Sequence, residues 1–389
     1  MDAMTRAQAT RRRKALRQSA KPRPGLPRAQ RPPADVTRDL FLVWRAPRVG
    51  EANPQRLTNP VWSWLARQRD LHAYTANAHF RGPSSLSVGP CWCASRFGQS
   101  ETALPDGRVI AIGGEHEDSY DPDFYIYNDV IVTDPAGALE IYGYSHAVFP
   151  PTDFHSATLD GERIIVIGCA GHPSQRVPAH TPVFALDTRT LAITRLETTG
   201  AAPGWLYKHQ AARSADGASI VVRGGERLIE VDGEQMFREN PDDWSLDLGR
   251  LVWTRLTERR WQQWELARAD GKTNNLLMIW CGSHDAQSER PFARKQLAEL
   301  EQDLGFLPDF TRHAQRFAPP LEHTTIESDH GAQIVVDGVT VRYREEPYSV
   351  RVTIEGPLAP EKVQVLIEDA RAKLEELERT PYVARPIGE

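Results

Sequence analysis

An acidic stretch with one histidine and two tyrosines holds the residue types best suited to chemistry or recognition. Carboxylates and imidazole are common metal ligands. However, the stretch lacks the Asp-x-Asp-x-Asp-Gly order of a calcium loop and the His-Glu-x-x-His pattern of a zinc protease, so we assign no metal and no cofactor to it. A plain solvated loop would have this composition, and carboxylates beside aromatic rings would also suit contact with a basic protein partner. The candidate binding residues are Glu115, His116, Glu117, Asp118, Tyr120, Asp121, Asp123 and Tyr125.

Three other patterns are weaker indications of chemistry. Cys169 with His172 offers a nucleophile and a base, but no third residue is identifiable to orient the base. Cys91 and Cys93 have the wrong spacing for a zinc knuckle and lack a second pair. Residues 143–147 loosely match a nucleophile elbow, which requires a strand, a turn and a helix in an α/β sheet. None of the three specifies a reaction.

An internal repeat positions the acidic stretch. Asp-Gly pairs recur at spacings of 54 to 56 residues, and each is followed by an apolar run that ends in glycine. Asp-Gly suits a tight hairpin turn, and the run after it suits a strand buried on both faces. Two more strands are predicted after each of the first three runs, over residues 129–132 and 139–142, 183–186 and 191–196, and 244–246 and 251–256. The pairs are Asp106-Gly107, Asp160-Gly161, Asp216-Gly217 and Asp270-Gly271, and the glycines are Gly113, Gly168, Gly224 and Gly282.

These units resemble kelch repeats, which form four-stranded blades of β-propellers. The resemblance covers about residues 96–290 and implies an interaction scaffold, or less commonly an enzyme with its site on the propeller axis. Three repeats are clear, and the one from Asp270 to Gly282 is degenerate. His155 and His209 occupy near-equivalent positions, where we expect a structural hydrogen-bonding role. The matching segments are Arg96-Phe97-Gly98-Gln99-Ser100 through Gly113-Gly114, His155-Ser156-Ala157 through Gly168-Cys169, and His209-Gln210-Ala211 through Gly224-Gly225.

Three good repeats are too few to close a propeller, which needs about four to eight blades. Strands from residues 40–44 or from a hairpin over 334–355 are candidates to complete it, and an incomplete, capped propeller is the alternative. Outside the repeats, apolar spacing predicts helices over 57–72, 291–304 and 360–378, and strands over 334–343 and 348–355. The expected domains are a tail over 1–37, an N-terminal segment over 38–95, repeats over 96–290 and an α+β domain over 291–389.

Composition narrows the class of protein. The 389-residue chain has a net charge of −5, yet residues 1–37 hold ten basic and two acidic residues, so the remainder is acidic. This proline-rich tail is expected to be disordered, and nucleic-acid binding is disfavoured because no aromatic residue precedes Phe41. No apolar run approaches the length of a membrane span, the N-terminus lacks a secretory pattern, and the four cysteines are scattered. We therefore expect a cytoplasmic protein.

The sequence thus predicts a mainly β protein: a kelch-type β-propeller, incomplete or capped, with a C-terminal α+β segment. The predicted function is non-enzymatic binding of a protein partner, with a basic one favoured, through the propeller loops. The alternative is an enzyme acting on a carbohydrate or another small molecule, with His116, Cys169 and His172 in an axial funnel.

Overall fold

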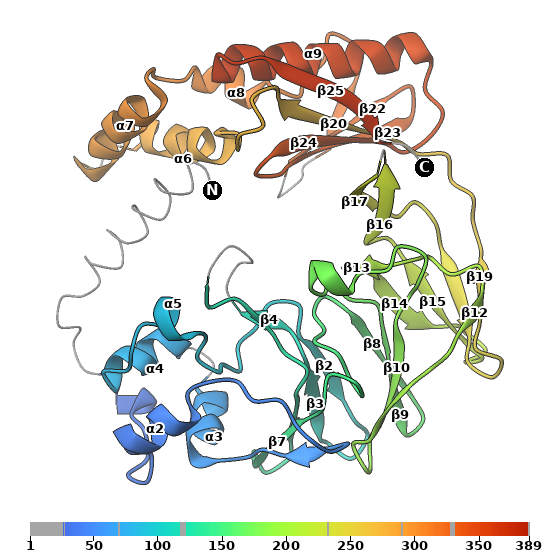
Figure 1. Ribbon diagram of the computed structural model, residues 1–389. Helices are drawn as coiled ribbons and strands as arrows, with labels where there is room; N and C mark the ends of the chain where they lie inside the picture. Colours follow the sequence, from blue (N-terminus) through green and yellow to red (C-terminus); the bar gives the residue numbers. More distant parts are fainter. Residues whose placement is uncertain are drawn as a thin grey trace. The chain divides into compact units, whose positions relative to one another are not determined.

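The protein is a mixed α/β chain with several antiparallel sheets, shown as a computed structural model in Figure 1. The structure describes residues 26, 28–68, 71–116, 122–231, 233–288, 291–326 and 331–387. The chain divides into two compact units, Met1–Gln175 with Pro182–Leu196, and Arg176–Thr181 with Glu197–Glu389. Within the described ranges, no helix has the length and apolar character needed to cross a membrane.

Three sheets share one antiparallel up-and-down order, and they contain the strands predicted from the repeat. The first repeat sheet consists of β2 (Ser100–Ala103), β3 (Val109–Ile112), β6 (Val130–Thr133) and β7 (Leu139–Gly143), with β1 (Gln55–Arg56) added beside β7. The second repeat sheet consists of β8 (Ser156–Asp160), β9 (Arg163–Ile167), β10 (Val183–Asp187) and β11 (Ile193–Arg195). The third repeat sheet consists of β14 (Gln210–Arg213), β15 (Ser219–Arg223), β18 (Trp244–Asp247) and β19 (Val252–Arg255), with β12 (Thr199–Gly200) beside β19.

Two β-hairpins are inserted at the same place in the first and third repeat sheets, between the second and third strands. Hairpin β4–β5 comprises Glu115–His116 and Tyr125–Ile126, directly after Gly113-Gly114. Hairpin β16–β17 comprises Glu226–Val231 and Glu234–Glu239, directly after Gly224-Gly225, and β13 (Leu206–Tyr207) pairs with β16. Glu115 and Glu226 therefore occupy equivalent positions.

The first and second repeat sheets pack against each other within the first unit. Ile110, Ile112 and Val130 lie in one buried cluster with Val166 and Phe184 of the second sheet. The neighbouring strands β2 and β8 are also linked, because the Ser100 hydroxyl lies 2.7 Å from Nε2 of His155. The predicted structural role of His155 between repeats is confirmed.

Helices cover the opposite face of the first repeat sheet. This N-terminal cap comprises α2 (Arg38–Trp44), α3 (Pro60–Arg67), α4 (Ala73–His79) and α5 (Ser85–Val88). Its core stacks Trp62 on Trp92 at 4.9 Å, and the same cluster includes Ala111, Ile131 and Ile141 from the sheet. The cap therefore covers the face of the first repeat sheet that lies opposite the second repeat sheet.

Two sequence-based expectations change in the N-terminal segment. The strand predicted over residues 40–44 is wrong: α2 forms there, because the Thr37 hydroxyl accepts from the Leu40 N–H as an N-cap and Phe41 is buried. The expected tail over 1–37 also ends earlier, since Leu26 and Val36 are buried in the cap core. Residues 1–25 and 27 lie outside the described residues.

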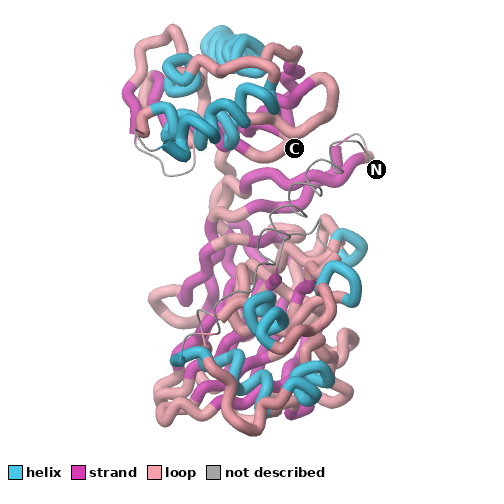
Figure 2. The backbone as a smooth tube through the Cα atoms, turned by 90° about the vertical axis from the view of Figure 1, so that its left-hand side faces the viewer, coloured by secondary structure: helices cyan, strands magenta, loops and turns pink. Residues whose placement is uncertain are grey.

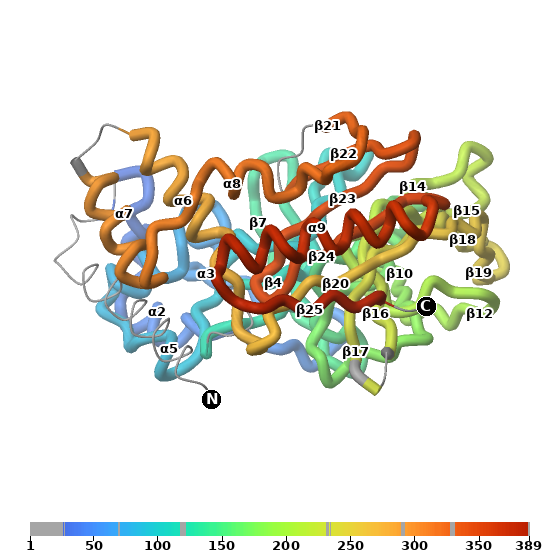
Figure 3. The backbone as a smooth tube through the Cα atoms, turned by 90° about the horizontal axis from the view of Figure 1, so that it is seen from above, coloured from blue at the N-terminus to red at the C-terminus, as the bar shows by residue number. Residues whose placement is uncertain are grey.

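A C-terminal module, defined by its six-stranded sheet, includes β20 (Gln262–Arg268), which precedes the expected domain boundary at 290/291. β20 lies between β24 (Ser349–Ile354) and β25 (Tyr382–Ile387) in a six-stranded sheet that also contains β21 (Thr324–Ile326), β22 (Ala332–Val336) and β23 (Val339–Glu345). The predicted helices over 291–304 and 360–378 are confirmed as α7 (Pro291–Leu304) and α9 (Pro360–Glu378). Figure 3 shows α9 running along this sheet.

Two further predictions for this region are wrong. Residues 276–280 belong to helix α6 (Leu276–Ala286), which packs against α7 and α8 (Phe310–Ala314), because a short apolar run does not distinguish strand from helix. The strand predicted over 334–343 is two strands joined at Asp337-Gly338. The hairpin over 334–355, one of the candidates to complete the propeller, belongs to the sheet of the C-terminal module. Figure 2, coloured by secondary structure, shows both helices and strands in the described chain.

The glycine that follows each second strand has a left-handed backbone, as Gly113 shows with φ of +58°. A Cβ atom at Gly113 would lie 2.3 Å from the Thr152 carbonyl oxygen. At Gly137, which is also left-handed and lies in the turn between β6 and β7, it would meet nothing within 4 Å. We predict that Gly137→Ala lowers the free energy of unfolding by about 1–2 kcal/mol and that Gly113→Ala lowers it by clearly more. Urea unfolding of both variants measures the difference, and equal losses would mean that the contact at Thr152 relaxes.

Helix α9 is held to the module by an apolar stripe that includes the fully buried Leu374. We predict that Leu374→Ala lowers the free energy of unfolding of the module by about 2–5 kcal/mol. Val365→Ala, at an exposed position of the same helix, is the matched control and should change it little. Thermal unfolding followed by circular dichroism measures both, and unchanged melting of Leu374→Ala would contradict this packing.

Candidate interaction site

Hairpin β4–β5 contains the described members of the acidic stretch. Glu115 pairs with Ile126 in the hairpin and exchanges two backbone hydrogen bonds with Phe97, whose side chain is 66% exposed. Tyr125 is partly buried, and burial raises its pKa. The candidate residues Glu117, Asp118, Tyr120 and Asp121 lie outside the described residues.

Two of the predicted binding residues are buried: His116 ends β4, and Asp123 lies just before β5. Asp123 is 1% exposed and accepts a hydrogen bond of 2.5 Å from the Tyr74 hydroxyl of α4. His116 is also buried, its ring centre lies 6.1 Å from that of Tyr74, and burial lowers its pKa. These side chains join the hairpin to the cap, and the surface available to a partner consists of other residues, including Phe97.

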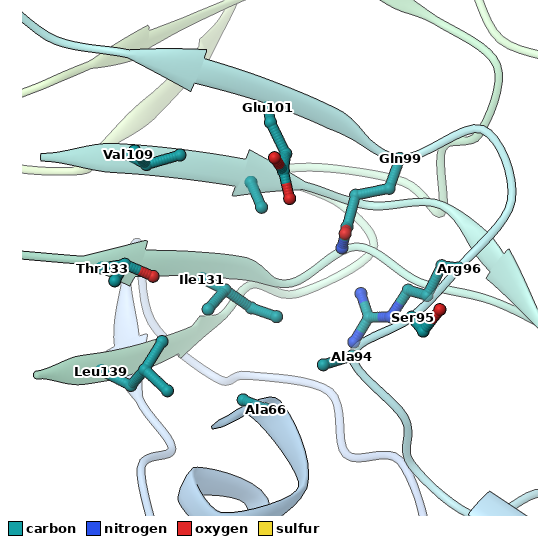
Figure 4. Close-up of a pocket in the computed structure, with 11 residues that line it drawn as sticks. Ala66, Ala94, Ser95, Arg96, Gln99, Glu101, Val109, Ile131, Thr133 and Leu139 are labelled. Carbon is teal, nitrogen blue, oxygen red and sulfur yellow. The ribbon is translucent and has the colours of Figure 1, made fainter. Parts of the chain in front are cut away.

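A cavity of about 380 Å³ lies between the cap and the first repeat sheet. In Figure 4 the side chains of Glu101 and Gln99 extend toward a space that Ile131 and Leu139 border from below. We call it the Glu101 cavity. Its lining comprises Ala66, Ala94, Ser95, Arg96, Gln99, Glu101, Val109, Ala111, Ile131, Thr133 and Leu139.

The guanidinium of Arg96, beside this cavity, is part of a buried ion pair. It binds both carboxylate oxygens of Asp129, which also accepts from the Trp92 indole N–H at 2.9 Å. The guanidinium also lies over the Tyr127 ring at 3.4 Å. Burial opposes the charge of Arg96, but Asp129 outweighs it and raises the arginine pKa. The pair fixes the lead-in to β2 and has a net charge of zero.

Hairpin β16–β17 shows how the equivalent element in the third repeat sheet is used. The Glu226 carboxylate lies 3.1 Å from Arg344 and 3.3 Å from Arg351, both on the C-terminal sheet. Burial raises the pKa of Glu226, but these two positive charges outweigh burial and lower it. Glu239, which pairs directly with Glu226 in the hairpin, binds Arg342 at 2.5 Å.

The main chain supports the same contact. The side-chain amide of Gln263 in β20 donates to the Glu239 carbonyl and accepts from the Glu239 N–H. The glutamates at the base of an inserted hairpin therefore bind arginines presented by a β-sheet.

The other candidate residues differ in their surroundings. Cys169 is buried, while His172 is exposed and its Nδ1 lies 2.7 Å from the Ser174 hydroxyl. Cys91 and Cys93 are buried in the cap core. Within the part of the chain that the structure describes, no group of three or more His, Cys, Asp or Glu residues is arranged to hold a metal ion.

Sequence reasoning missed Glu101, because a single glutamate in a strand is usually on a solvent-exposed face. Comparing the repeats could have found it, because the other two repeats have alanine there.

No protein-family model matches the chain, and no curated protein is significantly similar to it.

His209 is buried, and burial lowers its pKa to about 4. Between about pH 6.5 and 4 the unfolded chain binds a proton at this residue that the folded protein excludes, so its contribution to stability falls as pH is lowered. The equivalent position in the first repeat is Gln99, which makes His209→Gln a suitable substitution.

Between pH 7 and pH 4, protonation linked to His209 should lower the free energy of unfolding of the parent by about 2–3 kcal/mol. We predict that His209→Gln does not show this decrease. Urea unfolding at pH 7 and pH 4 measures it. His313, whose pKa is also lowered to about 4, supplies a background loss in both proteins, so only the difference between variant and parent counts. An identical loss in both would contradict the assignment.

Proposed function

We propose that this chain is a kelch-type, propeller-like interaction protein that binds a basic protein partner at hairpin β4–β5. Three four-stranded antiparallel sheets with one strand order support the blade interpretation. In each of these sheets, the residue two positions before the first strand also has a left-handed backbone. These residues are Gly98, Phe154 and Lys208.

A common turn at the end of each third strand supports the same interpretation. The carboxylates of Asp134, Asp187 and Asp247 each accept a backbone N–H from the turn that follows. Such a repeated device is expected when one supersecondary unit recurs along a chain. In this proposal the N-terminal cap takes the place of a blade before the first one.

The arginine contacts of hairpin β16–β17 are the observation that carries the functional proposal. Glu226 directly follows a glycine pair and binds arginines of a sheet. Glu115 follows the equivalent pair, in a hairpin whose connecting sequence adds Glu117, Asp118 and Asp121. The same element with more negative charge suits a partner that presents arginine or lysine.

The exposed ring of Phe97 supports recognition at this place. Its backbone is paired to Glu115, so an aromatic surface lies beside an acidic one. Aromatic residues within a charged rim are common anchors of protein interfaces.

The test compares two charge reversals in the full chain. We predict that Glu117→Lys/Asp118→Lys/Asp121→Lys weakens binding of a fluorescent nona-arginine peptide at least tenfold, because the peptide loses its attraction to the hairpin. Phe97→Ala should also weaken binding, with less change in its salt dependence. Fluorescence anisotropy at two salt concentrations measures both effects.

The matched control is Asp35→Lys/Glu51→Lys/Glu162→Lys, three exposed residues of the same unit, which changes the net charge equally. Binding should remain close to that of the parent. Equal weakening by both triple variants would show attraction to overall charge rather than to the hairpin, and would sink the proposal.

A further inference from the structure

Glu101 is out of place in the repeat. Glu101 pairs with Ala111, the residue two positions before Gly113. In the second and third sheets the residues that occupy the same place in the pairing are Ala157 and Ala211. Blade packing therefore needs only a small side chain here. The carboxylate of Glu101 is an addition that the fold itself does not require.

The Glu101 cavity exists because the cap packs less completely against the first repeat sheet than the second repeat sheet does. The second sheet turns Val166 and Phe184 toward the first sheet, where they are buried. The first sheet has the smaller Ala111 and Ile131 at the equivalent positions, facing the cap. Ala66 of α3 also lines the cavity, so small side chains from both sides leave the space open.

The free hydrogen-bonding capacity of the cavity is mainly that of an acceptor. Within the described residues the Glu101 carboxylate has no hydrogen bond or ion pair, and it is exposed. The Gln99 amide N–H donates to the Gly113 carbonyl at 3.2 Å, which leaves its oxygen available. Arg96 uses four of its five N–H groups on Cys93, Gly113 and Asp129.

The charge beside the Glu101 cavity is also negative. Because Asp129 neutralises Arg96 through direct contact, the charge of Glu101 stays uncompensated beside the cavity. A ligand that presents several N–H donors and a positive charge would complement both the charge and the acceptors. Val109, Ile131 and Leu139 supply an apolar wall for an alkyl stem.

We propose that the Glu101 cavity binds an alkylguanidinium or alkylammonium group, with the cation at Glu101 and Gln99 and the stem along Ile131 and Leu139. The volume of about 380 Å³ falls at the small end of the usual range for ligand sites, which suits such a group. An arginine or lysine side chain of a protein and a small free amine share this chemistry. The first source would deepen the proposed function, but the cavity does not depend on hairpin β4–β5.

The test titrates n-butylguanidinium into the full chain and follows the methyl NMR signals of Ile131 and Leu139. We expect saturable shifts with a Kd on the order of 1 mM for so small a ligand. Neutral n-butylurea should bind at least tenfold more weakly, and methylguanidinium, which lacks the stem, should also bind more weakly.

Three variants separate binding from folding. Glu101→Ala, which restores the residue of the other two repeats, and Glu101→Gln should each weaken binding at least tenfold while leaving the melting temperature unchanged. Glu162→Ala, an exposed glutamate of the second repeat sheet's turn, should bind like the parent. Absence of saturable shifts, or equal binding by parent and Glu101→Gln, would overturn the proposal.

Two further arms identify the source of the cation and separate this inference from the proposed function. If the peptide acetyl-Ala-Arg-Ala-amide shifts the same methyl signals, the cavity accepts a protein side chain. If only butylguanidinium does, the cavity accepts a small free cation. Either result supports the cavity. The hairpin variant Glu117→Lys/Asp118→Lys/Asp121→Lys should still bind butylguanidinium. A result against the hairpin proposal, from the nona-arginine peptide, is therefore distinguishable from a result against the cavity proposal, from butylguanidinium.

Discussion

Coverage of both faces of the first repeat sheet is the constraint on which much of the first unit depends. Its strands alternate, so that Ile110 and Ile112 face the second sheet while Ala111 and Ile131 face the opposite way. A sheet with apolar side chains on both faces must be covered twice, because exposing either face costs about 25 cal/mol per Å². The second sheet covers one face, and the N-terminal cap covers the other. The Glu101 cavity lies where the second cover is incomplete.

The repeats also determine where binding elements can be inserted. Each second strand ends at a left-handed glycine such as Gly113 or Gly224, which turns the chain out of the sheet before the third strand begins. An insertion at this place leaves the four-stranded ladder intact, since the pairing of second and third strands resumes afterwards. Both inserted hairpins occur here, and both place a glutamate at their base.

Hairpin β16–β17 shows that such glutamates can hold arginines under partial burial. Desolvation of Glu226 alone would favour its neutral form, and its lowered pKa records that two arginines outweigh this cost. Breaking one partner of such a buried pair is strongly destabilising, so this contact makes the C-terminal module and the third repeat sheet depend on each other. The proposed partner of hairpin β4–β5 would use the same chemistry between two molecules.

The sequence by itself determined the features that depend on a few neighbouring residues. Asp-Gly turns, buried second strands and the boundaries of α9 follow from turn chemistry, apolar period and a proline start. Only the tertiary structure decided that residues 276–280 are helical, that β20 joins the C-terminal sheet, and that His116 and Asp123 are buried. These outcomes depend on which element covers which face, and the covering residues lie tens of positions away in the chain, where no local pattern records them.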